Sequence, residues 1–169
     1  MDDRSVVAWQ LGRAPRAFRR VAVRCPFGLP AVTEQEPYDP QGEPFPTTYY
    51  LTCRHLVTAV SRLEAAGGVE RWSEAAASEP ALAESLRRAT EEQRALREEL
   101  AAGRRGNDDG ASLALGIGGA ARPERLKCLH AHAAYALARP GYLLGERILG
   151  QLGAVWPETC CSLPAEEGG

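Results

Sequence analysis

The sequence contains no apolar run of roughly 18 residues or more, which a membrane-spanning helix would need. Its N-terminus also lacks the apolar centre of a secretory signal. We therefore expect a cytoplasmic protein with no membrane partner. In a reducing cytosol the five cysteines are not expected to form a disulfide framework, and an odd number fits one poorly. Free buried thiols, a metal site or a reactive cysteine are the explanations left for them.

A basic excess is missing as well, because the formal net charge is −2. This balance argues against a dedicated nucleic-acid-binding protein. Lysine is nearly absent, since Lys127 is the only lysine among 20 basic residues, so the number of arginines says little about function. The charges are unevenly placed: residues 1–24 carry six arginines, whereas residues 33–46 carry four acidic residues and no basic one. We expect these segments to be faces of opposite sign that meet in the fold.

What is present indicates one α+β domain over residues 1–169. With 44% hydrophobic residues, the chain is long enough to bury a core. Alternating apolar residues predict strands between residues 19 and 52, and six of the twelve prolines fall between Pro26 and Pro46. The β-sheet should therefore be small, interrupted by prolines and packed by helices. In chain order we expect a helix, strands and a helix (1–68), a charged helical hairpin (69–105), a glycine-rich loop (106–122), two helices (123–153) and a tail (154–169).

The helix expected over residues 78–105 carries a narrow apolar seam. Its members step alternately by four and three residues: Leu82, Leu86, Ala89, Gln93, Leu96 and Leu100. A seam of this width packs against one partner. We favour the protein's own domain as that partner. The alternative is another chain, in which case this helix and the basic N-terminus would bind a protein partner, or the helix would form a homodimer.

Cysteine and histidine supply the candidate metal ligands. Zinc or an iron–sulfur cluster needs about four thiolate or imidazole ligands that the fold brings together. Paired CxxC motifs are absent, but single cysteines stand at the ends of expected elements, and such ends can converge at one edge of a sheet. The candidate ligands are Cys25, Cys53, Cys128, His130, His132 and Cys160. The alternative is that the cysteines are buried as small apolar side chains.

The segment RPERLKCLHAHAAYALA is expected to be a helix that begins near Pro123, because proline is well tolerated at the first helical position. At about 100° per residue, Cys128 and His132 share one face of this helix and could hold one ion together. His130 faces the other way. We therefore expect His130 to be a core histidine with a hydrogen-bond partner.

A second candidate site combines backbone groups with basic side chains before this helix. Two adjacent glycines can adopt positive φ and expose successive N–H groups, next to the partial positive charge of a helix N-terminus. The set that would bind a phosphate or carboxylate is Gly118, Gly119, Arg122, Arg125 and Lys127. No named nucleotide-binding motif is matched. The alternative is a flexible connection with no ligand.

Several blocks of the sequence resemble a bacterial family, the domain of unknown function 501. The blocks are RCPFGLPAV, PFPTTYYLTC, SRLEAAGGV, and GIGG followed by RLKCLH. Their order and spacing make the similarity extend over most of the chain, from about Val6 to Ala138. No activity is established for that family, so the resemblance implies a relationship and not a reaction.

The resemblance does imply which candidate residues matter. It favours three of the candidate ligands over two others, whose positions vary in the family pattern: Cys25, Cys128 and His130 over Cys53 and His132. It also supports the run from Gly116 to His130 as one functional unit.

Two functional hypotheses follow. The first is a ligand-binding protein whose site lies where Cys25 meets the segment from Gly116 to His132, holding zinc, an iron–sulfur cluster or a phosphate-type small anion. The second is a non-enzymatic adaptor that binds a protein partner through residues 78–105 and the basic N-terminus. The residues identify no reaction, so the sequence leaves open whether the protein is an enzyme.

Overall fold

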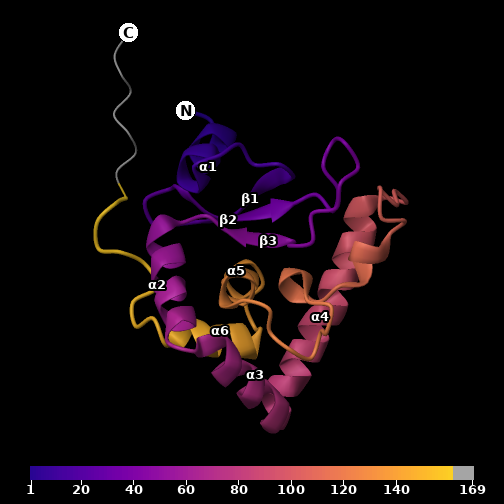
Figure 1. The fold of residues 1–169 in the computed structure, drawn as a ribbon. Helices are drawn as coiled ribbons and strands as arrows, with labels where there is room; N and C mark the ends of the chain where they lie inside the picture. Colours follow the sequence, from indigo (N-terminus) through magenta and orange to yellow (C-terminus); the bar gives the residue numbers. More distant parts are fainter. Residues whose placement is uncertain (162–169) are drawn as a thin grey trace.

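Three antiparallel strands form the sheet of the computed structural model, which describes residues 1–161 (Figure 1). Their order is β1–β2–β3, and Thr33 in the central strand pairs with Val21 on one side and Tyr50 on the other. The central strand is buried along its whole length. The prediction of a small sheet interrupted by prolines is confirmed. The strands are β1 (Phe18–Arg24), β2 (Pro30–Gln35) and β3 (Tyr49–Leu51).

Helices make up most of the rest of the described chain, which confirms the α+β class. They are α1 (Asp3–Leu11), α2 (Arg54–Ala65), α3 (Gly68–Ser78), α4 (Pro80–Ala101), α5 (Leu129–Ala138) and α6 (Leu143–Gly150), with short 3₁₀ turns η1 (Ala111–Ala114) and η2 (Ile117–Gly119). Within residues 1–161, no helix is both long enough and apolar enough to cross a membrane.

Helix α5 lies at the centre of the molecule. Figure 1 shows it below the sheet and above α6, with α2 on one side and α4 on the other. Seven of its ten residues are buried, and they lie on all sides of the helix. A helix that is apolar all round belongs in a core, so α5 is the element around which the others are arranged.

The prediction that this helix begins near Pro123 is wrong. Helix α5 begins at Leu129, after an extended N-cap residue, Cys128 (φ −154°, ψ 158°). The preceding turns are held against α3, because the backbone N–H of Leu126 donates to Ser73 Oγ at 3.2 Å. A continuous helix would direct that N–H to a carbonyl four residues earlier. The contact with α3 therefore replaces the first turns of the expected helix.

The seam of α4 packs inside the protein, as we favoured. Its first four members are buried: Leu82, Leu86, Ala89 and Gln93. Further along the same helix Arg97 is fully buried, and its Nη1 donates to the carbonyl of Phe45 at 3.0 Å. Helix α4 is thus joined to the chain segment that precedes β3. The last two members of the seam, Leu96 and Leu100, are partly exposed.

The two segments of opposite charge meet, as predicted. The carboxylate of Glu34 is buried on β2 and contacts the guanidinium groups of Arg19 and Arg20 on β1 at 3.3 and 2.8 Å. Arg16 and Asp39 form a further pair at 3.4 Å. Arginines of the basic N-terminus are therefore engaged within the chain.

The Glu34→Gln substitution is expected to lower the free energy of unfolding by roughly 1–3 kcal/mol, because it removes a buried acceptor of charge-assisted hydrogen bonds. Glu98→Gln is the matched control, because Glu98 pairs with Arg105 while both side chains are about half exposed. That change should cost at most about 1 kcal/mol. Urea unfolding of the three proteins measures both effects, and equal losses for the two variants would contradict the prediction.

Candidate functional site

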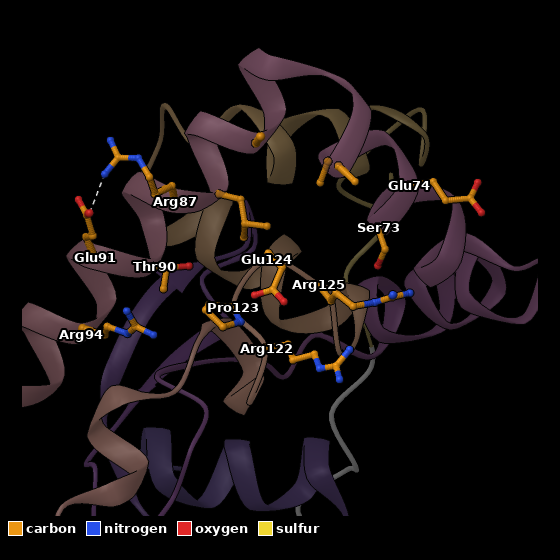
Figure 2. A pocket seen from close by; sticks show the side chains of 14 residues that line it. Ser73, Glu74, Arg87, Thr90, Glu91, Arg94, Arg122, Pro123, Glu124 and Arg125 are labelled. Atoms are coloured by element: carbon orange, nitrogen blue, oxygen red, sulfur yellow. Dashed lines mark hydrogen bonds and ion pairs between the residues drawn. The ribbon is translucent and has the colours of Figure 1, made fainter.

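A cavity of about 640 Å³ opens between α3, α4 and the turns at residues 122–125 (Figure 2). Its charged lining consists of four arginines and three glutamates: Arg87, Arg94, Arg122, Arg125, Glu74, Glu91 and Glu124. Two of the arginines come from α4 and two from the turns. Its apolar lining includes Ala76 on α3 and Leu86 on α4. A cavity of this size can hold a metabolite-sized molecule.

The arginines of this pocket differ in how they are paired. Arg87 contacts the carboxylates of Glu84 and Glu91 at 2.5 and 2.6 Å, so its charge is balanced on α4 itself. The other three, Arg94, Arg122 and Arg125, form no ion pair with any residue in the described part of the chain. Arg94 is held in place by a 2.7 Å hydrogen bond from Nε to the carbonyl of Ala114. Unbalanced guanidinium groups therefore face one cavity from two chain segments.

Thr90 adds a buried hydroxyl to the same pocket. Its side chain projects from α4 into the pocket in Figure 2, and the residue is only 4% exposed. The hydroxyl has no hydrogen-bond partner in the protein. A buried polar group without a partner is unusual in a folded protein, and a ligand in the pocket would supply one.

The structure divides the predicted anion-binding set. Gly118 and Gly119 do adopt positive φ, 71° and 80°, as expected. They pack beside Cys128 and near Lys127, at the N-terminal end of α5. The remaining two members, Arg122 and Arg125, line the pocket between α3 and α4 instead.

The cysteines are also separated. Cys25 and Cys53 line one small pocket together with Cys161, whereas Cys128 lines a different cleft and Cys160 is exposed. Burial raises the pKa of the Cys53 and Cys128 thiols, which disfavours the thiolate form that binds metals. Within residues 1–161, no three cysteine, histidine or acidic side chains are close enough together to hold a metal ion.

The expected roles of the two neighbouring histidines are reversed. His132 is the core histidine, 1% exposed, and His130 is partly exposed. Both histidines lie in α5 and point to different sides of it: His130 faces α2 and His132 faces Tyr142. Inside the core, His132 Nδ1 lies 2.7 Å from the hydroxyl of Tyr142. Burial lowers the pKa of His132 to about 3, so this imidazole is neutral at neutral pH, and its Nδ1 shares a hydrogen bond with the Tyr142 hydroxyl.

His130 contacts two residues of α2 that sequence reasoning did not select. Its Nε2 lies 3.1 Å from Ser61 Oγ, and its Nδ1 lies 2.5 Å from Glu64 Oε1. The N–H at Nδ1 is not aligned well enough with Glu64 to count as a regular hydrogen bond. Ser61 and Glu64 are three residues apart and so share a helix face. A serine and a glutamate at this spacing do not by themselves predict a site, and only the fold brings the imidazole of His130 next to both of them.

Comparison with known proteins gives one match. The sequence model of a family described as "Protein of unknown function (DUF501)" matches residues 21–150 of the 169-residue chain. The matched range includes Arg122 and Arg125 of the turns and also Ser61, Glu64 and His130. No curated protein and no solved structure matches.

The neutral state of His132 makes stability depend on pH. The ordinary histidine pKa is 6.5, so below this pH the imidazole of His132 is protonated in the unfolded chain. In the folded chain it stays neutral down to about pH 3. Stability is therefore complete above pH 6.5 and falls as the pH falls from 6.5 toward 3. The free energy of unfolding of the His132→Gln variant should depend less steeply on pH, with a slope that is smaller than that of the wild type by up to about 1.4 kcal/mol per pH unit. Urea unfolding over this range tests this, and parallel curves for both proteins would contradict it.

Proposed function

The chain belongs to the family described as "Protein of unknown function (DUF501)", and we propose that this member binds a small phosphate- or carboxylate-bearing molecule in the pocket between α3 and α4. The observation that carries the proposal is the set of three arginines without an acidic partner among the described residues: Arg94, Arg122 and Arg125. Guanidinium groups bind phosphate and carboxylate through paired hydrogen bonds, which explains why an anion fits this lining.

The other lining groups narrow the class of ligand. Glu74 and Glu124 accept hydrogen bonds and would repel a bare, highly charged anion. The buried hydroxyl of Thr90 donates to an oxygen or accepts from an N–H group. Alanines and Leu86 supply apolar contact. The lining suits an anionic metabolite that also carries hydroxyl or amino groups and an apolar part.

The structure gives less support to the metal-site and adaptor hypotheses from the sequence. A zinc or iron–sulfur site would need its ligands gathered, and in the described chain Cys25 lines a different pocket from Cys128 and His130. An adaptor would need a free apolar seam on α4, and of its four leucines Leu82 and Leu86 are buried while Leu96 and Leu100 are partly exposed. The phosphate-type anion is the version of the first hypothesis that the geometry supports.

We expect wild-type protein to bind glucose 6-phosphate or O-phosphoserine saturably and with a rise in melting temperature. Arg125→Ala should weaken that binding by about tenfold or more, because a charge-assisted hydrogen bond is worth roughly 1.5–3 kcal/mol. Arg122→Ala should act in the same direction. Glu124→Gln should tighten binding, because it removes a negative charge from the lining. Isothermal titration calorimetry with each compound measures these changes.

Arg62→Ala is the control, since Arg62 is an exposed arginine near the end of α2 that does not line this pocket. It should bind like the wild type. Equal weakening by Arg62→Ala and Arg125→Ala would show nonspecific charge attraction and would sink the proposal. The absence of saturable binding by wild-type protein to any of the probes would do the same.

A further inference from the structure

His130 stands between a hydroxyl and a carboxylate in an order that resembles a catalytic triad. Ser61 Oγ lies 3.1 Å from its Nε2, and Glu64 Oε1 lies 2.5 Å from its Nδ1. Triads recur on unrelated folds and are recognised by this geometry rather than by position in the chain. Here the serine and the glutamate come from α2, and the histidine comes from the first turn of α5.

The carboxylate determines which nitrogen of His130 carries the proton. The carboxylate of Glu64, 2.5 Å from Nδ1, favours the tautomer with the hydrogen on Nδ1, because a lone pair there would be repelled. In this tautomer the lone pair of Nε2 accepts the O–H of Ser61. The carbonyl of Val57, 3.3 Å from Nε2, can accept only when Nε2 also carries a proton. In its neutral form, His130 is therefore arranged as a general base for Ser61.

The serine is accessible from a cleft, separate from the arginine-lined pocket. This cleft has a volume of about 490 Å³, lies between α1, β3, α2 and α5, and is lined by Ser61, His130 and Thr52. Ser61 is exposed, so a substrate can reach its hydroxyl. Thr52 is 1% exposed, and its hydroxyl has no partner in the protein. An unpartnered buried hydroxyl in the lining is an independent sign that a ligand group belongs there.

We propose that Ser61 is the nucleophile of an acyl-transfer site that takes carboxylic esters. Ser61 Oγ attacks the carbonyl carbon and forms a new C–O bond, while its proton passes to His130 Nε2. The bond to the alcohol then breaks, and the leaving oxygen takes this proton. Water attacks the acyl-serine next, with its proton passing through Nε2 back to Ser61 Oγ, and the carboxylic acid leaves.

Cys128, which lines the same cleft, is the less suitable nucleophile. Burial raises the pKa of its thiol, so the thiolate is scarce at neutral pH. Ser61 has an imidazole at hydrogen-bond distance, whereas no such base contacts Cys128 among the described residues. The cleft is therefore assigned to the serine.

Diisopropyl fluorophosphate tests the assignment on the full-length protein. The Ser61 oxygen displaces fluoride from phosphorus, and the adduct is located by peptide mass mapping. We expect one adduct per chain, on Ser61, that is absent in Ser61→Ala. His130→Gln should slow labelling by about 100-fold or more, the usual effect of losing a general base. Hydrolysis of p-nitrophenyl acetate should fall in parallel in both variants.

Ser78→Ala is the matched control, because Ser78 is also exposed on a helix but bonds only to backbone carbonyls. It should label like the wild type. No adduct on Ser61 in the wild type, or labelling of His130→Gln at the wild-type rate, would overturn the proposal. Thermal unfolding checks that each variant is folded. Ser61→Ala changes an exposed helix position and should leave the fold intact. Loss of the adduct in this variant therefore identifies the labelled residue even if His130→Gln is destabilised.

Discussion

The burial of α5 on all sides is the constraint on which the rest of the structure depends. A helix can be surrounded only when its neighbours approach closely, and four of its seven buried residues are alanines. Two neighbours meet it through glycine: a Cβ on Gly145 of α6 would lie 2.6 Å from Ala136 Cβ, and one on Gly68 of α3 would lie 2.8 Å from Leu129 Cδ1. Larger side chains there would force α6 and α3 away from α5.

Both candidate sites follow from how the chain enters this central helix. The hydrogen bond from Leu126 to Ser73 holds the preceding turns against α3, and these turns complete the arginine-lined pocket. Helix α5 begins shortly after these turns, and His130 in its first turn lies at the edge of the core next to α2. His132, two residues further, stays inside, where its Nδ1 shares a hydrogen bond with the Tyr142 hydroxyl. A helix beginning at Pro123 would have removed the turns that line the pocket.

The sequence predicted the class of fold, the small interrupted sheet and the meeting of opposite charges, because periodicity, proline and charge are local signals. The predictions from the sequence were wrong or incomplete where contacts between distant segments of the chain determine the local structure. Nothing in the segment around Pro123 indicates that Ser73, about fifty residues earlier, would take a backbone hydrogen bond from it. The same holds for Ser61, whose relation to His130 spans 69 positions in the chain. Conversely, the clustering of Cys128, His130 and His132 in sequence suggested one site, but only Cys128 and His130 line the same cleft, whereas His132 is buried in the core.

Arginine illustrates how structure turns an uninformative composition into a functional argument. With Lys127 as the only lysine among 20 basic residues, the abundance of arginine carries no meaning by itself. The arginines differ in their partners. Arg16, Arg19 and Arg20 of the N-terminal segment contact Asp39 or Glu34. Arg97 is buried and donates to the Phe45 carbonyl and the Thr48 hydroxyl. Arg122 and Arg125 are among the exposed arginines that have no acidic partner in the described chain, and they line a pocket that also contains a buried hydroxyl without a hydrogen-bond partner. An anionic ligand in this pocket would contact these guanidinium groups, so the position of the arginines, and not their number, supports binding.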